Sequence, residues 1–277
     1  MTWRFRDILG LPDPGEARRQ RLAEIEADRE YRAHRLNRKD TEYWTQAVIA
    51  AAAEVRRLPP TRRPCAYRNW LGVLNEYSRE PPFTGDPPSY RTSLPGRLMQ
   101  FTADVAQPAW PEPLPHLVEF AFAFLEADVM LHRSGYAKRH LIKRLKAVPL
   151  DKAQIKRMEN LLRRAVEKGA SVEEFRAYRK IAAHLVARGE LTEFRGWLEQ
   201  MAAGTIIPYA FLDWPHLWDK FDARSFKKQG GIWRFYPDEP SAELPPKKQD
   251  ETSQKAGLGA FWMLRQIARH EGNRTLG

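Results

Sequence analysis

The chain has 277 residues, 43% of them hydrophobic, and nine tryptophans, which is enough apolar material for one large domain or two smaller ones. It carries 46 Lys and Arg against 35 Asp and Glu, a net charge of +11, and a single cysteine, Cys65. One thiol excludes an internal disulfide and a multi-cysteine zinc site. The apolar content also argues against a largely disordered chain.

Neither the N-terminus nor the most apolar segment suggests a secreted or membrane protein. The first seven residues include basic side chains with no apolar run behind them, so no signal peptide is predicted. The most apolar segment, 114–131, still contains three carboxylates, which favours a buried helix over a membrane span. We therefore expect a cytoplasmic protein with no membrane span.

The N-terminal part of the chain predicts three helices. Residues 16–39 form a highly charged helix with only a thin apolar stripe. Asp40 is a suitable N-cap for a second helix that runs to about Arg57, where two prolines end it. A third helix is expected over 66–79, because its apolar residues recur at spacings of three and four.

Prolines crowd the next segment, 80–114, which predicts a connector with one short helix near 96–105. Regular apolar spacing then returns, and residues 115–204 predict helices joined by short turns. Short turns favour antiparallel neighbours. The expected fold is therefore mainly α, an antiparallel helical bundle or α-hairpin stack with a small aromatic-rich C-terminal subdomain.

Local signals place several boundaries in this helical region. The first, buried helix is expected to end near His132, and the next to span 136–148. Asp151 followed three residues later by Gln154 resembles a capping box that opens another helix. Glycines 169, 189 and 204 are expected to end the helices before them.

The C-terminal part contains an aromatic-rich segment, 205–236, in which Gly230 and Gly231 suggest a hairpin turn. A polar stretch and a terminal helix over about 258–270 follow it. Six segments result: 1–79, a charged helix and helical hairpin; 80–114, the connector; 115–204, a basic helical bundle; 205–236, the aromatic-rich subdomain; 237–257, a flexible linker; and 258–277, the C-terminal helix.

Positive charge is concentrated in residues 133–168, where twelve Lys and Arg face three carboxylates, a net +9 in 36 residues. Cations at helical spacing can reach successive phosphates of a nucleic-acid backbone. The candidate phosphate-binding residues are Lys138, Arg139, Lys143, Arg144, Lys146, Lys152, Lys156, Arg157, Arg163, Arg164 and Lys168. The structural alternative is a solvated charged face, but acidic partners are nearly absent within this segment.

These residues favour a non-enzymatic, nucleic-acid-binding accessory protein that grips the phosphate backbone, as a subunit of a larger nucleoprotein complex. No helix-turn-helix, zinc-finger or RNA-recognition motif is present, so sequence-specific readout of DNA or RNA is not expected. The alternative is a helical interaction scaffold whose basic face docks an acidic protein. No cofactor is predicted.

The aromatic-rich segment offers a second binding hypothesis. Trp218, Trp233 and Tyr236 are interleaved with cations and could stack unpaired bases. A small aromatic core is the stronger interpretation, since large apolar rings are costly to expose.

A distant third hypothesis is a metal-dependent hydrolase, because Asp213, His216 and Asp219 lie three residues apart. On a helix of 3.6 residues per turn, such a series drifts by about 60° per step and does not converge on one ion. We therefore predict no metal site and no catalytic residues. His140 lies among Lys and Arg residues, which are expected to push its side chain toward the neutral form.

Overall fold

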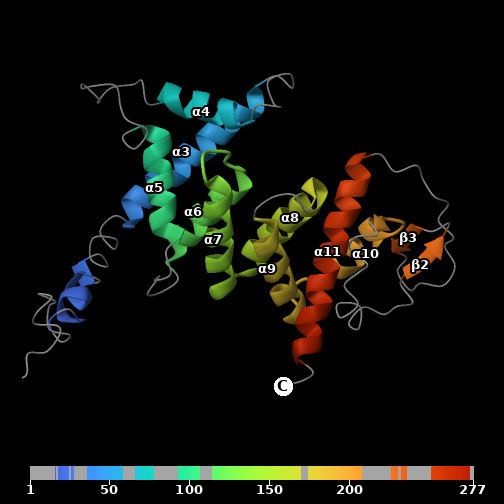
Figure 1. Cartoon of the computed structure of the whole chain (residues 1–277). Coiled ribbons are helices and arrows are strands. Elements are labelled where there is room, and N and C mark those ends of the chain that lie inside the picture. The colour runs from blue at the N-terminus through green and yellow to red at the C-terminus, as the bar shows by residue number, and fades with distance from the viewer. Residues whose placement is uncertain are drawn as a thin grey trace, which may run out of the picture.

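A computed structural model of the chain describes residues 16, 18–24, 26–27, 36–58, 66–77, 93–106, 114–169, 174–207, 226–229, 232–235 and 251–274. Helices make up most of this part of the chain, and three short strands form one sheet (Figure 1). The mainly α prediction is confirmed.

The long helices are α3 (Arg38–Arg57), α4 (Ala66–Tyr77), α5 (Leu94–Ala106), α6 (Pro115–Glu126), α7 (Ser134–Ala147), α8 (Lys152–Lys168), α9 (Phe175–Ala187), α10 (Phe194–Ala202) and α11 (Glu251–Arg274). The strands are β1 (Ile206–Ile207), β2 (Phe226–Gln229) and β3 (Ile232–Phe235).

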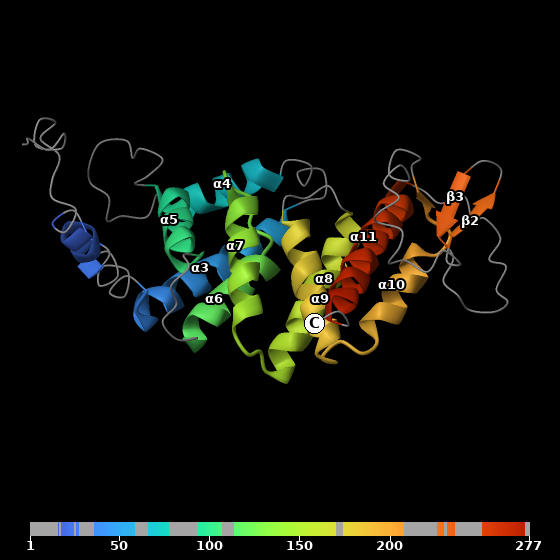
Figure 2. The same cartoon turned by 60° about the horizontal axis from the view of Figure 1, so that its bottom comes forward.

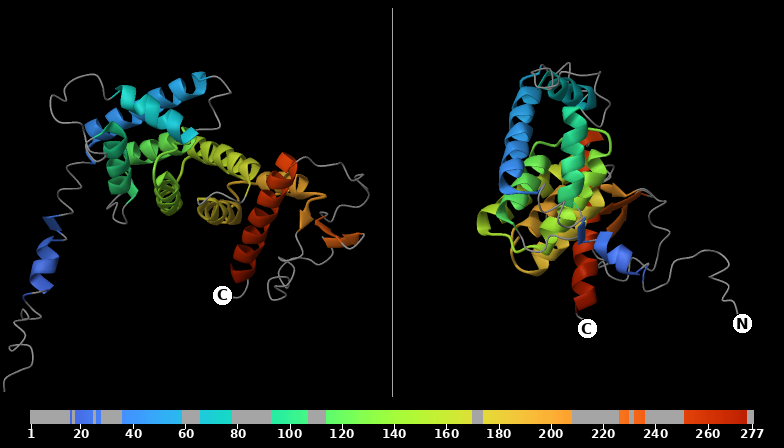
Figure 3. Two further views of the ribbon diagram at one scale, coloured as in Figure 1. Left: turned by 45° about the horizontal axis from the view of Figure 1, so that its top comes forward. Right: turned by 90° about the vertical axis from the view of Figure 1, so that its left-hand side faces the viewer.

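The helices form an elongated stack, with α3, α4 and α5 at one end and α10 with the strands at the other (Figures 1 and 2). Helix α7 packs on α5, α6 and α9, and α11 packs on α8, α9 and α10. Figure 3 shows the same order from two further directions. This is the α-hairpin stack that the short turns predicted.

One hydrophobic core runs through the stack from α3 to α11. Val48 of α3, Phe101 of α5 and Phe120 of α6 belong to it, and the two phenylalanine rings meet edge to face at 4.9 Å. Helix α5 therefore contributes core side chains, although it arises within the proline-rich connector. The division into six segments stays a prediction.

Several local signals are confirmed. Asp151 and Gln154 form a reciprocal capping box at the start of α8. Gly169, Gly189 and Gly204 all have left-handed backbone angles just after helices. Strands β2 and β3 pair antiparallel with Gln229 opposite Ile232, which confirms the predicted hairpin.

Other boundaries differ from the predictions. Asn37, rather than Asp40, is the N-cap of α3, because its side chain accepts a 2.9 Å hydrogen bond from the Asp40 amide. Helix α6 ends at Glu126, six residues before His132, since Asp128 adopts a left-handed φ of 53° that a helix cannot contain.

The terminal helix is longer than predicted, and one strand was not predicted. Helix α11 begins at Glu251, inside the predicted linker, where an ion pair joins Glu251 to Lys255 one turn later. Strand β1 has two residues and pairs with β3 next to Arg234 and Trp233. A strand this short carries no alternating pattern that sequence reasoning could detect.

Candidate nucleic-acid interface

Most cations of α8 pair with carboxylates, either of α8 itself or from elsewhere in the stack. Arg157 binds Glu119 at 2.6 Å and Glu126 at 2.7 Å, and its guanidinium lies 4.6 Å from the ring centre of Phe122. The hydrogen bonds that Arg157 donates to Glu126 and to Glu119 raise the pKa of its guanidinium further above its ordinary value despite burial. Arg157 therefore clamps α8 to α6.

A second α8 cluster is internal to the helix. Glu159 accepts hydrogen bonds from Lys156 at 2.9 Å and Arg163 at 2.6 Å. Burial acts to raise the pKa of Glu159, but these cations hold it below its ordinary value. The Arg163 guanidinium also lies over the Trp197 ring at 4.5 Å. Both cations have a partner within the protein, and the Lys156 side chain remains 67% exposed.

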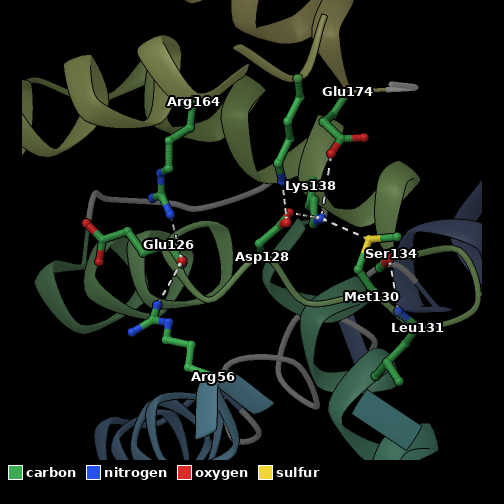
Figure 4. Close-up of polar contacts among 10 residues, drawn as sticks. Arg56, Glu126, Asp128, Met130, Leu131, Ser134, Lys138, Arg164 and Glu174 are labelled. Atoms are coloured by element: carbon green, nitrogen blue, oxygen red, sulfur yellow. Dashed lines mark hydrogen bonds and ion pairs between the residues drawn. The ribbon is translucent and has the colours of Figure 1, made fainter. Parts of the chain in front are cut away.

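A buried ammonium of α7 lies against the turn between α6 and α7 (Figure 4). The Lys138 side chain is 2% exposed, and its Nζ lies 2.7 Å from Asp128 Oδ1 and 3.6 Å from Glu174 Oε1. Lys168 from the end of α8 also binds Asp128. The prediction that Lys138 lies on an exposed basic face is wrong, because its charge stabilises the junction of α7, α9 and this turn.

The backbone of the same turn is held by two arginines (Figure 4). Arg164 donates a 3.1 Å hydrogen bond to the carbonyl of Glu126, and Arg56 donates to the same oxygen at 3.4 Å. Similarly, Arg144 donates to the carbonyl of Ala106 at 3.3 Å, and burial lowers the pKa of this guanidinium. These arginines therefore donate hydrogen bonds to carbonyl groups at helix ends, which occupies the Arg144 and Arg164 guanidinium groups that were predicted to bind phosphate.

Apart from Glu159, the acidic partners lie outside residues 133–168, so a charge count within that segment does not include them. The sequence of α6 does contain one signal of these acidic partners. Glu119 and Glu126 are seven residues apart on an otherwise apolar helix, so they share one face and require a cationic partner when that face packs. The positive field inferred from the charge count is therefore weaker over α8 than the sequence implied.

A different surface retains its positive charge. It is formed by α7, α9 and α11, which lie next to one another in the stack (Figures 1 and 2). We call it the α7–α9–α11 face, and its members are Lys143, Lys146, Arg176, Arg179, Lys180, Arg265 and Arg269, with His140, His184 and His270 among them. Of the eleven predicted residues, Lys143 and Lys146 belong to it.

Two further predicted residues lie beside or away from this face. Arg139 is half-buried near the start of α7, with its guanidinium 5.8 Å from the ring centre of the exposed Tyr136. Lys152 is exposed at the start of α8, next to the capping box.

The cations of the face lie close enough together to lower one another's pKa. Burial lowers the pKa of Lys180, and so do the charges of Arg176 from its own helix and of Lys143 and Lys146 from α7. Burial likewise lowers the pKa of Arg179, as do Arg176 and Arg265 of α11. Besides burial, neighbouring like charges therefore act on Lys180 and Arg179.

Among the described residues, the ion pairs nearest this face lie at its margins. Arg188 binds Glu190 at 2.7 Å beyond the end of α9, and Arg195 binds Glu271 at 3.2 Å near the end of α11. Within the described parts of the chain, no carboxylate pairs with the following exposed or half-buried cations: Lys143, Lys146, Arg176, Lys180 and Arg269. This unbalanced charge distinguishes the face from α8.

The histidines on the face make its charge sensitive to pH. Burial lowers the pKa of His140 below its ordinary 6.5, as do the nearby Lys143, Arg139 and Arg144. Burial and the charge of Lys146 do the same for His184. Both imidazoles are therefore neutral near pH 7, as predicted for His140.

We expect acidification from about pH 7 to about pH 5.5 to destabilise the fold through these histidines. The unfolded chain protonates its histidines near their ordinary pKa, whereas the folded chain does so only at lower pH. The unfolded state therefore binds more protons in this window, and stability falls as pH falls. Urea unfolding of the wild type and of the double variant His140→Gln, His184→Gln tests this. A variant as acid-sensitive as the wild type would contradict it.

The remaining predicted residues are only partly covered by the structure. Trp218, Tyr236 and the acidic cluster Asp213, His216, Asp219 lie outside the described residues. Trp233 lies on β3, with its backbone opposite Ile207 and Lys228. Across the described residues, no group of three or more His, Cys, Asp or Glu is arranged to hold a metal ion.

Comparison with protein families, curated proteins and solved structures finds no match to this chain. The helices that the structure describes include none with both the length and the apolar character needed to cross a bilayer.

Proposed function

We propose that this protein binds nucleic acid, gripping the phosphate backbone with the α7–α9–α11 face as a non-catalytic component of a nucleoprotein assembly. The observation that carries the proposal is the gathering of cations from three helices without carboxylate partners among the described residues. Binding a polyanion would relieve the repulsion between them and release condensed counterions.

The arrangement favours repeated anions over a single one. Arg176 and Lys180 are four residues apart on α9, so these two cations form a line along that helix, which His184, neutral near pH 7, continues. Each step along the line is about 6 Å for a rise of 1.5 Å per residue. Cations one helical turn apart on α9, beside those of α7 and α11, suit a polymer of phosphates. No base-reading motif accompanies it, so we propose recognition of the backbone without sequence-specific readout.

We place this binding in the cytoplasm, where a chain with Cys65 as its only cysteine needs no disulfide. An acidic protein that docks on the same face is the alternative partner, and competition distinguishes the two. If an acidic polypeptide displaces the nucleic acid only at a large molar excess, the phosphate polymer is the preferred ligand.

The experiment is a charge reversal with one residue on each helix of the face: Lys143→Glu, Lys180→Glu and Arg269→Glu together. All three side chains are exposed, so folding should be retained. We expect the slope of log affinity against log salt on duplex DNA to shrink by about 3, because each lost phosphate contact removes about 1. Fluorescence anisotropy across a salt series measures it.

The matched control reverses three exposed cations elsewhere in the stack: Lys39→Glu on α3, Arg68→Glu on α4 and Lys152→Glu on α8. Both triple variants change the net charge equally. The proposal requires the control to bind nearly as the wild type does. Equal loss in both variants would show that net charge alone, rather than this face, drives binding.

A further inference from the structure

The width of the α7–α9–α11 face bears on which nucleic acid it holds, and the argument rests on the proposed function. Helices that pack directly have axes about 8–10 Å apart, so α7 and α11, on either side of α9, lie roughly 16–20 Å apart. Cations occupy all three helices: Lys143 on α7, Lys180 on α9 and Arg269 on α11. The positive surface is therefore broad as well as long.

The two edges of the face both adjoin the central helix. Lys146 from α7 and His270 from α11 each lower the pKa of His184 on α9, after the effect of burial. Lys138 near the start of α7 lies 3.6 Å from Glu174 at the start of α9, and Lys146 lies near His184 later in both helices. Helices α7 and α9 therefore run in the same direction, with their cations in parallel lines.

The aromatic ring on this face is not free to stack on bases. Trp262 of α11 is half-buried, with the Arg179 guanidinium 5.6 Å and the Arg265 guanidinium 4.9 Å from its ring. Proteins that hold single strands generally add exposed aromatic platforms to a basic groove. Among the large exposed apolar side chains described, only Tyr136 belongs to α7, α9 or α11, and it lies beside the face near Arg139.

A duplex presents two lines of phosphates. They flank a major groove about 12 Å wide, so a surface whose outer helix axes lie roughly 16–20 Å apart is broad enough to reach both strands across it. A single strand offers one line of phosphates and can engage only part of a face this broad. We infer that the α7–α9–α11 face spans a groove of a double-stranded nucleic acid, with α7 and α11 contacting opposite phosphate strands.

The test compares three probes of the same sequence at the same salt: duplex DNA, duplex RNA and single-stranded DNA. The inference predicts that at least one duplex binds about tenfold or more tightly than the single strand, with a steeper salt dependence. The two duplex arms show whether B-form or A-form geometry is preferred, and a preference for either supports the inference.

Single-residue variants at the two edges sharpen the test. Lys143→Glu and Arg269→Glu should each reduce the duplex salt slope by about 1, because each edge contacts its own strand. An equally tight single strand, or an Arg269→Glu variant with unchanged duplex binding, would overturn the duplex assignment and leave phosphate binding intact. Loss of binding to all three probes would instead overturn the proposed function itself.

Discussion

Replacing Lys138 by alanine is expected to lower the free energy of unfolding by about 3–5 kcal/mol, the cost of breaking a buried ion pair by removing one partner. The Lys138 side chain is 2% exposed and lies between Asp128 and Glu174. Without the ammonium, the half-buried Glu174 loses its cationic partner, and a cavity replaces the aliphatic stem. Urea unfolding at neutral pH measures the loss.

The control is Lys143→Ala, five residues along the same helix, where the side chain is exposed. A surface substitution of this kind should change stability by less than about 0.5 kcal/mol. A second variant, Lys138→Met, keeps the aliphatic stem and removes only the charge. Its loss of unfolding free energy should therefore lie between the losses of Lys143→Ala and Lys138→Ala. If Lys138→Ala proves no more costly than Lys143→Ala, the ammonium does not hold this junction.

The second large effect is expected at Gly259 of α11, where alanine should cost about 3 kcal/mol through overpacking. A Cβ at this position would lie 2.7 Å from the carbonyl oxygen of Val166 and 3.4 Å from Cα of Gly169. Both neighbours are backbone of α8 or its end, so no flexible side chain can move aside. The terminal helix would have to shift away from α8.

Gly196 in α10 provides the matched control, because a Cβ there meets nothing within 4 Å. Gly196→Ala should stabilise the protein by up to about 1 kcal/mol, since alanine is the better helix former. The two glycine substitutions therefore have opposite expected signs in the same unfolding experiment. Equal and small effects at both positions would mean that α11 does not pack closely against α8.

Local chemistry accounts for what the sequence predicted correctly. The capping box at Asp151 and the glycine stops act through neighbours within a few residues, so they are visible in a linear reading. The break at Asp128 was missed because its left-handed backbone is stabilised by Lys138 and Lys168, which arrive from other helices. That stabilisation depends on tertiary structure.

The sequence misjudged which cations stay unpaired for the same reason. A count of charges along the chain assigned the positive field to residues 133–168, but Arg157 and Lys138 are neutralised by carboxylates of α6, its following turn and α9. Meanwhile, Arg176 and Arg269 are 93 positions apart in the sequence and share a face only because α9 packs on α11. Charge along a sequence does not predict which carboxylates will fold onto it.

The most direct test of the α7–α9–α11 face is a lysine-acetylation footprint of the intact protein with and without duplex DNA, measured by mass spectrometry. Bound phosphates should protect Lys143, Lys146 and Lys180, while Lys39 and Lys152 remain as reactive as in the free protein. Protection centred on Lys152 and Lys156 instead, or uniform protection of all exposed lysines, would contradict the assignment of phosphate binding to this face.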